Sequence, residues 1–308
     1  MATQPTHPNA KANILIIGQG DIGQPVTNKL AEMANQSGQR LGHHLGHCSN
    51  YRSDYNVTGL ARGERHKYDL HDDAGFIQAD ALKVTAEQLR DFTHIAIIVT
   101  PDNYDADAYK NTYLGIAQHI ADLSKELPDI ERVVFISSTG VYGQNNGEWV
   151  DETVAPVTPE REGSIYILKA EQALQQAYGD KAVIIRPSGI YGKDRLMRIR
   201  KVKEDNKPAM PRYAWSNRIM DTDLIHIIAQ VLTIDKAQLK PLYLATDYAP
   251  VSTYELAKWL CEQLDTSVPE IDDSAPVSGK RLHSNIPLAW LEYPDWQVGY
   301  QYILKTLN

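Results

Sequence analysis

Three glycines at fixed spacing carry the clearest chemistry in the sequence. Gly18, Gly20 and Gly23 directly follow a short β-branched segment, with Asp21 and Ile22 between the last two. In a strand-to-helix turn of this kind the first glycine permits the tight turn. The second lets the backbone approach a pyrophosphate, and the third lets helix and strand pack closely. The following helix offers its unpaired N–H groups to the phosphates. The pattern therefore predicts a dinucleotide site that includes Asp21 and Ile22 as well as the three glycines. The alternative is a tight turn in an empty sheet.

Arg62 stands near the end of the second predicted strand. An NAD-specific site places an Asp or Glu there, against the ribose 2′-hydroxyl. A guanidinium matches the 2′-phosphate of NADP instead, because it offers paired N–H donors to phosphate oxygens. We therefore expect NADP as the cofactor, with NAD as the alternative. The other interpretation of Arg62 is an exposed charge in a loop.

Two further strand ends carry residues within reach of a nucleotide. Asp80 and Ala81 follow the third predicted strand, where a short acid can accept a hydrogen bond from an adenine amino group. Thr100 and Pro101 follow the fourth strand, at the carboxyl edge of the sheet. Ligands bind at this edge in open α/β folds, so we include these four residues in the predicted cofactor site.

Six apolar segments must supply the strands that position these residues. They alternate with helical stretches, and this alternation predicts an α/β Rossmann fold, a doubly wound parallel sheet with helices on both faces. The predicted strands are 13–17, 55–60, 75–78, 94–100, 132–137 and 182–186, and the clearest helices are 26–35 and 109–127.

The alternation ends after the sixth strand, where shorter segments punctuated by prolines begin. We predict a mainly substrate-binding part there, with segments that return to the sheet. The predicted organisation is a flexible tail over 1–12, a dinucleotide-binding domain over 13–186 and the substrate-binding part over 187–308, from which segments near 217–232 and 242–246 return to the first domain.

The composition disfavours several classes of protein. Hydrophobic residues make up 43% of the 308 residues and charged residues 23%, which are ordinary globular proportions. A net charge of −8 argues against a nucleic-acid partner. We expect no membrane span, because no apolar run approaches the required length of about 20 residues. The two cysteines form no CxxC pair, and we expect the cytoplasm.

The polar segment 37–54 contains His43, His44, His47 and Cys48. Side chains of these types can bind a metal ion. We interpret the segment as a solvated loop, because the sequence contains no second cluster of ligands, and we predict no metal site.

Two strand ends carry a more specific signature. The segments 136–143 (ISSTGVYG) and 185–192 (IRPSGIYG), with the glycine turn and Asp80, resemble the extended short-chain dehydrogenases/reductases of the NAD-dependent epimerase/dehydratase family. Further similarity lies in 217–224, 250–252 and 279–282. The resemblance implies an NAD(P)-binding oxidoreductase acting on a small-molecule substrate of the nucleotide-sugar class, with Pro187 beside the cofactor.

The resemblance also implies a catalytic Ser, Tyr and Lys. Ser138 matches the family's serine and would polarise the substrate oxygen. The family's Tyr and Lys lie four residues apart on one helix, so the ammonium can hold the nicotinamide ribose and lower the phenol pKa. Here Ile165 stands four residues before Lys169, and Tyr166 stands three before it, rotated about 100° around the helix. We predict Ser138, Tyr166 and Lys169 as the catalytic residues.

The displaced tyrosine leaves alternatives open. Tyr142 and Tyr191 are other phenols near the sheet edge, and Tyr166 fits a core or an interface equally well. A non-catalytic NAD(P)-binding sensor or scaffold of the same fold is one alternative function. An NADPH-dependent reductase of a non-sugar carbonyl is another.

Two features suggest partners of the chain. Basic residues within 195–203 and at 280–281 are expected to bind an anionic substrate, or else form a solvated face. An apolar stripe on the helix over 105–127 is typical of core packing. Because the resembling family often pairs this helix with the next across an interface, we also expect a homodimer.

Overall fold

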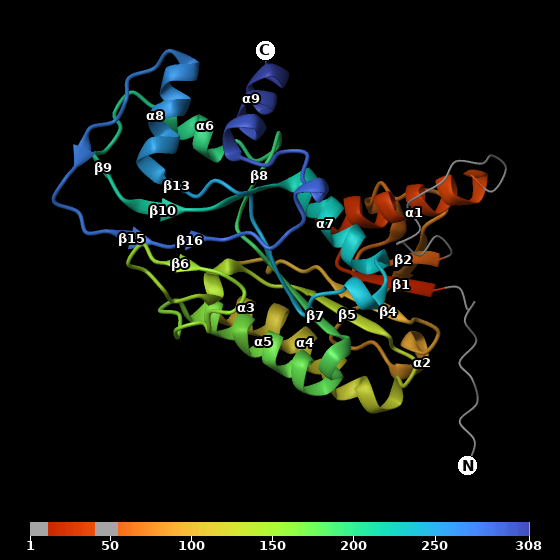
Figure 1. The fold of residues 1–308 in the computed structure, drawn as a ribbon. Coiled ribbons are helices and arrows are strands. Elements are labelled where there is room, and N and C mark those ends of the chain that lie inside the picture. The colour runs from red at the N-terminus through yellow and green to blue at the C-terminus, as the bar shows by residue number, and fades with distance from the viewer. Residues whose placement is uncertain (1–11, 41–54, 308) are drawn as a thin grey trace.

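The computed structural model describes residues 12–40 and 55–307, and its centre is a seven-stranded sheet (Figure 1). The strand order is β12-β7-β5-β4-β1-β2-β3, and neighbouring strands run parallel. These strands are β1 (Ala12–Ile17), β2 (Tyr55–Ala61), β3 (Gly75–Gln78), β4 (His94–Ile97), β5 (Arg132–Ile136), β7 (Ala182–Pro187) and β12 (Leu242–Ala245). The predicted doubly wound parallel sheet is confirmed.

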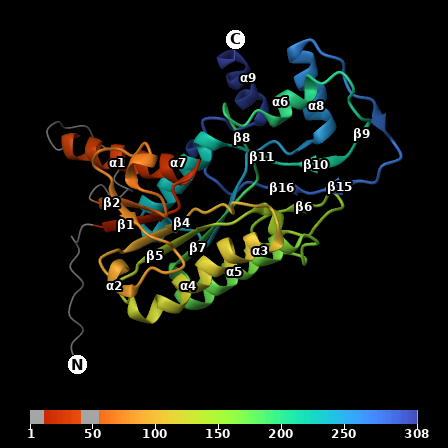
Figure 2. The same cartoon turned by 180° about the vertical axis from the view of Figure 1, so that it is seen from behind.

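The central strands divide their side chains between two cores. Ile14 and Ile16 face the layer of α1 (Gly23–Arg40) and α7 (Asp221–Thr233). Leu15 and Ile17 face the layer of α4 (Ile116–Asp122) and α5 (Glu162–Tyr178). Figures 1 and 2 show the two helical layers from opposite sides. Because helices cover both faces, the strands are apolar on both sides, as their sequences indicate.

A smaller lobe formed by the C-terminal half lies beyond the carboxyl ends of the strands (Figure 1). Its helices are α6 (Met197–Val202), α8 (Thr253–Leu264) and α9 (Trp296–Thr306), and they enclose a separate apolar core. Its short paired strands are β8 (Gly189–Tyr191) with β11 (Arg218–Met220), β10 (Ala214–Ser216) with β13 (Val251–Ser252) and β15 (Ser278–Gly279), and β9 (Met210–Pro211) with β14 (Ile271–Asp272). A further pair, β6 (Trp149–Val150) with β16 (Arg281–Leu282), joins this lobe to the sheet domain.

Two elements of the C-terminal half return to the sheet domain. Helix α7 packs against α1, and β12 pairs with β7 at the edge of the sheet. The remaining α-helices of the described residues are the short α2 (Ala86–Leu89) and α3 (Ala106–Tyr109).

The helix predicted over 109–127 is not continuous. After α3 the backbone widens into a π-helical segment, Lys110–Gly115, before α4, and a 3₁₀ turn, Leu123–Glu126, ends the helical stretch. The apolar stripe faces the sheet, with Ile116 and Ile120 buried in the core and the Tyr113 ring edge-on to Phe135 at 6.3 Å. This stripe therefore packs within one chain, and the homodimer stays a prediction.

Two expected absences concern a membrane span and a metal site. No helix within 12–40 and 55–307 has both the length and the apolar character needed to cross a membrane. The same residues contain no group of three or more His, Cys, Asp or Glu that could hold a metal ion. His43, His44, His47 and Cys48 lie outside the described residues, as does nearly all of the predicted tail.

Candidate functional site

The turn between β1 and α1 is closed by contacts that only glycine permits. Gly18 has a φ of 95°, and a Cβ atom there would lie 2.1 Å from the carbonyl oxygen of Ile98. A Cβ atom on Gly23 would lie 2.0 Å from the carbonyl oxygen of Gly18. The Gly18 N–H donates to the carbonyl oxygen of Leu60 at 2.9 Å. The turn is therefore held between the ends of β2 and β4, and these two positions require glycine.

Gly20 faces open space. No atom lies within 4 Å of the position that its Cβ would take, unlike the crowded positions of Gly18 and Gly23. Below the turn, the buried Gln19 side chain donates to the carbonyl oxygen of Ile16 at 3.0 Å and accepts from the Thr27 hydroxyl at 3.1 Å. An anchored turn with one open glycine at a helix N-terminus fits a dinucleotide pyrophosphate.

Arg62 lies beyond β2 and pairs with an acid from beyond β4. Its Nη2 atom lies 2.9 Å and 3.2 Å from the two carboxylate oxygens of Asp102, and this hydrogen bond raises the pKa of Arg62. Since β1 lies between β2 and β4, the ion pair spans the strand that leads into the glycine turn. The side chains are 70% and 73% exposed, so the pair is open to solvent and to ligands. The sequence indicates Arg62, but no motif in it indicates the acidic partner Asp102.

The other predicted cofactor residues lie at the same sheet edge. An Oδ1 atom of Asp80 accepts from the N–H of Leu82 at 3.0 Å, which leaves Oδ2 turned towards Lys83 at 4.0 Å. Ala81 is buried in the core, Thr100 is exposed, and Pro101 is buried. Pro187 is the last residue of β7, and Ile22 packs against the core beside α1.

Ser138 follows β5, and its hydroxyl is partly engaged. Its Oγ atom accepts from the N–H of Gly140 at 3.0 Å, which leaves the O–H free to donate. The residue that approaches it from α5 is Ser164. A Cβ atom on Gly140 would lie 3.2 Å from the Oγ atom of Ser138 and 3.3 Å from that of Ser164. Two hydroxyls therefore lie beside Gly140, and only that of Ser138 was predicted from the sequence.

Tyr166 and Lys169 lie side by side on α5. The Lys169 ammonium lies 5.7 Å from the centre of the Tyr166 ring. The Tyr166 hydroxyl donates to Glu162 at 2.8 Å, and this hydrogen bond raises the pKa of the phenol. Lys169 is exposed. The buried face of the helix instead carries Gly163, Ser164, Ile167, Ala170, Glu171, Leu174 and Tyr178. The structure thus brings Tyr166 and Lys169 together and directs the phenol to Glu162, while Ser164 and Ser138 both lie beside Gly140.

A buried ion pair fixes α5 to the sheet behind Ser138. Arg186 donates to the two carboxylate oxygens of Glu171 at 2.9 Å and 2.6 Å, and the Ser137 hydroxyl donates to the same carboxylate. The Arg186 guanidinium lies 4.7 Å from the centre of the Tyr142 ring. Burial raises the pKa of Tyr142, whose side chain is 1% exposed. Tyr142 is therefore a packing residue of this network.

A second polar cluster lies where β7 and β12 end and β8 and β11 begin. We call Ser188, Tyr191, Arg218 and Asp247 the Arg218 cluster. The backbone N–H of Asp247 donates to the carbonyl oxygen of Arg218 at 2.7 Å, and Tyr191 pairs with Met220 across β8 and β11. Five of the six buried side-chain atoms without a hydrogen-bond partner in the described residues belong to this cluster: Ser188 Oγ, Tyr191 OH, Arg218 Nε, Arg218 Nη2 and Asp247 Oδ2.

The Arg218 cluster has the chemistry of an oxyanion site. Nε and Nη2 form the edge of a guanidinium that binds carboxylate or phosphate through two parallel hydrogen bonds. Burial raises the pKa of Asp247 to about 8, so at neutral pH this carboxyl is mostly uncharged and does not repel an anion. Because buried polar groups are almost always satisfied, we expect ligand or water atoms to complete this cluster.

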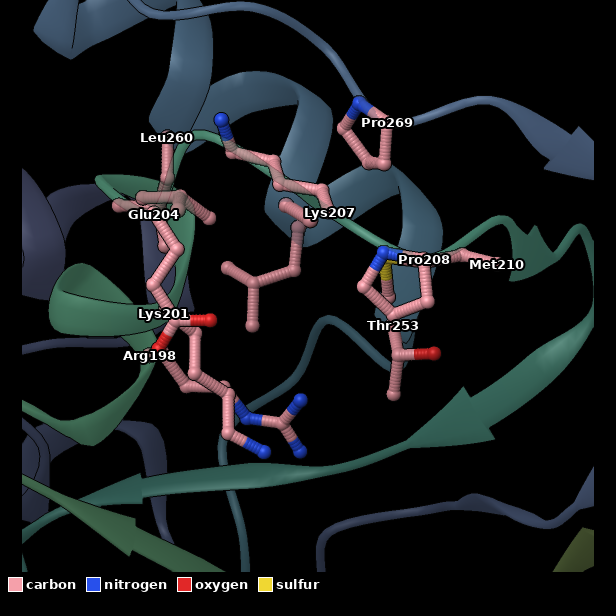
Figure 3. A pocket seen from close by; sticks show the side chains of 12 residues that line it. Arg198, Lys201, Glu204, Lys207, Pro208, Met210, Thr253, Leu260 and Pro269 are labelled. Carbon is pink, nitrogen blue, oxygen red and sulfur yellow. The ribbon is translucent and has the colours of Figure 1, made fainter.

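The basic residues predicted to bind an anion have separate environments. Arg198 and Lys201 lie at the rim of a cavity of about 220 Å³ between α6 and α8, whose interior is apolar (Figure 3). Lys280 donates to the carbonyl oxygens of Tyr142 and Gln144 at 2.6 Å and 3.3 Å.

Arg281 lies between two aromatic rings. Its guanidinium lies 4.9 Å from the ring centre of Trp149 and 4.8 Å from that of Trp215. Lys280 and Arg281 therefore hold the two lobes together.

Comparisons with known proteins concern the family and the fold of the chain. A sequence model of the NAD dependent epimerase/dehydratase family matches residues 38–228, which include the predicted catalytic residues and begin after the glycine turn. No curated protein matches the chain. The fold is similar to that of a proposed NAD-dependent epimerase/dehydratase from Methylobacillus flagellatus, with 28% identity, a TM-score of 0.70, and coverage of 97% of this chain and 99% of that chain.

Two more distant structures share the fold. One is a UDP-glucuronic acid 4-epimerase from Bacillus cereus in complex with NAD, at 17% identity and a TM-score of 0.66, covering 96% of this chain and 100% of that chain. The other is DesIV, a dTDP-glucose 4,6-dehydratase from Streptomyces venezuelae with NAD and TYD bound. It has 16% identity and a TM-score of 0.68, and the match covers 95% of this chain and 96% of that chain.

Proposed function

Because the chain belongs to the NAD-dependent epimerase/dehydratase family, we propose that it binds NAD(P) and transfers a hydride at a hydroxyl-bearing carbon of a nucleotide sugar. The observation that carries this proposal is the turn from Gly18 to Gly23. It is closed at Gly18 and Gly23 and open at Gly20, as a pyrophosphate-binding turn requires. NAD(P) supplies the hydride donor or acceptor when it is bound.

The proposed substrate class rests on two structures with this fold, which are named for UDP-glucuronic acid and dTDP-glucose. We propose that this chain also acts on a nucleotide sugar. The unpartnered atoms of the Arg218 cluster are buried, and the Tyr191 hydroxyl packs against Gly299 of α9. A diphosphate therefore reaches this cluster only if the surrounding side chains open.

The chain's own residues provide the acid–base groups. The Oγ atom of Ser138 accepts from the N–H of Gly140, so its O–H is free to donate to an acceptor such as the substrate oxygen. Tyr166 carries the proton in our proposal, with Lys169 beside it. Glu162 holds the phenol in this structure, so Tyr166 must leave Glu162 to reach a substrate at Ser138.

The hydrogen bond from Tyr166 to Glu162 also favours a second candidate function. A family member whose phenol is turned away from Ser138 can bind NAD(P) without transferring a hydride. Such a protein would act as a cofactor sensor or a scaffold.

A titration and an isotope experiment separate these functions. Purified protein is titrated with NADPH and NADH by fluorescence, and we expect Gly20→Val to abolish binding by filling the open side of the turn. The protein is then incubated with deuterated NADPH or NADH and with the 4-keto forms of UDP-glucuronic acid and dTDP-glucose, whose carbonyl carbon can accept the deuteride. Deuterium in the sugar supports the oxidoreductase, whereas binding without exchange supports the sensor or scaffold. No binding of either cofactor contradicts both.

A further inference from the structure

Arg195 reaches from the C-terminal half of the chain to the glycine turn. Its Nη2 atom lies 3.0 Å from the Oδ2 atom of Asp21, which stands between Gly20 and Gly23. We propose that Arg195 is a ligand of the cofactor pyrophosphate, contributed by the segment that follows β8. This proposal rests on the proposed function, because it concerns the cofactor bound at that turn.

The backbone of Arg195 is fixed relative to the turn. Its N–H donates to the carbonyl oxygen of Gly192 at 3.0 Å and closes a tight turn over residues 192–195. Gly192 packs directly on Asp221, the first residue of α7, because a Cβ atom there would lie 1.9 Å from the Asp221 Oδ2 atom. Helix α7 packs in turn on α1, the helix that begins at the glycine turn. Arg195 therefore has a defined position at the phosphate-binding end of α1.

The charges favour a pyrophosphate over Asp21 as the partner of Arg195. The Asp21 side chain is 85% exposed, whereas that of Arg195 is 32% exposed, so the guanidinium is the more buried member of the pair. Asp21 offers one negative charge in solvent, where exposed ion pairs contribute little. A pyrophosphate offers two charges and several acceptor oxygens that match a planar guanidinium. The incoming cofactor thus competes with Asp21 for Arg195 and gains the stronger interaction.

This arrangement gives the two partners opposite effects on cofactor affinity. Removing the Arg195 charge removes a ligand and leaves the Asp21 carboxylate beside the phosphates. Removing the Asp21 charge frees Arg195 and removes a repulsion. A purely structural ion pair predicts that either substitution has the same effect.

The test is a fluorescence titration of NADH and NADPH against wild type, Arg195→Gln, Asp21→Asn and Lys193→Gln. Lys193 is the matched control, since it is an exposed cation two residues away in the same turn. We expect Arg195→Gln to raise the Kd of both cofactors about tenfold, since both contain the pyrophosphate. We expect Asp21→Asn to lower the Kd about threefold and Lys193→Gln to change it less than twofold. Circular dichroism and thermal melting confirm that each variant is folded.

The outcomes separate the proposal from the proposed function. Unchanged affinity in Arg195→Gln overturns the role of Arg195 while the cofactor site stands, provided that Gly20→Val still abolishes binding. Weakening of equal size in Arg195→Gln and Asp21→Asn also overturns it and assigns the pair to the fold. Absence of cofactor binding in wild type overturns both the proposed function and this proposal.

Discussion

At the residue scale, we expect Arg62 and its partner Asp102 to determine the preference for NADP over NAD. In this structure the guanidinium that would bind a 2′-phosphate is paired with a carboxylate. We predict that Arg62→Ala raises the Kd of NADPH about tenfold and leaves that of NADH unchanged, because only NADPH carries the 2′-phosphate. Asp102→Asn should strengthen NADPH binding selectively, since the guanidinium is then free. Both are measured by fluorescence titration, and equal changes for the two cofactors would remove Arg62 from the specificity site.

Asp247 makes stability depend on pH through its burial. Its pKa of about 8 in the folded chain exceeds the value of about 3.9 expected when unfolded, although Arg218 opposes the shift. The folded state thus keeps a proton that the unfolded state loses. The resulting stabilisation is complete below about pH 4 and is lost as the pH rises through about 8.

The prediction is a difference between wild type and Asp247→Asn. From pH 5 to 8.5, we expect the free energy of unfolding of wild type to fall relative to that of the variant. The fall should exceed about 1 kcal/mol, roughly the value of one pKa unit. Urea denaturation at three pH values measures it. Parallel pH profiles of the two proteins would show that Asp247 keeps an ordinary pKa.

At the residue scale, the sequence predicts some features of the site and not others. The spacing of Gly18 and Gly23 was sufficient to predict the tight turn, because a Cβ atom at either position would meet a backbone carbonyl oxygen. The spacing of Tyr166 and Lys169 was insufficient, because i and i+3 neighbours can point either to the site or to solvent. Glu162, one turn earlier, accepts the phenol's hydrogen bond. The orientation of Tyr166 therefore depends on a contact that no motif describes.

At the scale of elements, α5 is held to the sheet by one buried charge pair. Glu171 and its partner Arg186 lie on different elements, and their side chains are 2% and 7% exposed. We predict that Glu171→Gln destabilises the protein by about 3–5 kcal/mol, because it leaves a buried guanidinium without its carboxylate. Gln172→Glu, on the exposed face of α5, is the control and should change stability by less than about 0.5 kcal/mol. A loss below 1 kcal/mol for Glu171→Gln in urea denaturation would mean that Arg186 is satisfied by other groups.

The elements themselves were predicted better than their irregularities. The strands were evident because buried parallel strands are apolar on both faces. The π-helical segment from Lys110 to Gly115 was not evident, because one extra residue in a helical turn leaves the apolar spacing nearly unchanged. The packing role of Gly163 was not evident from the sequence either. In the structure it makes room for the Tyr109 ring, whose Cγ would lie 2.9 Å from a Cβ atom at this position.

At the scale of the whole molecule, the chain passes between the two lobes several times. Helix α7 and strand β12 belong in sequence to the C-terminal half and in space to the sheet domain. The β6–β16 pair and the stacked Arg281 join the lobes from the opposite side. The sheet domain takes core residues from both halves of the sequence, whereas the core of the smaller lobe comes from residues 191–304 alone. The sheet domain therefore cannot complete its core without the C-terminal half. We therefore predict that the lobes unfold in one cooperative transition despite their separate apolar cores.

Cofactor binding extends this prediction, because the glycine turn and Arg195 belong to the two different halves of the chain. A ligand at one hundred times its Kd stabilises the folded state by about 2.7 kcal/mol, which for a chain of this size raises the Tm by about 4 °C. Far-UV circular dichroism follows the helices and strands of both lobes. In a variant with Trp149 and Trp290 replaced by Phe, tryptophan fluorescence follows only the smaller lobe, where Trp215, Trp259 and Trp296 lie. With NADPH present, both signals should shift together by the same amount. Two separate transitions, with only one raised by NADPH, would instead show that the lobes fold independently and that the cofactor is held by the sheet domain alone.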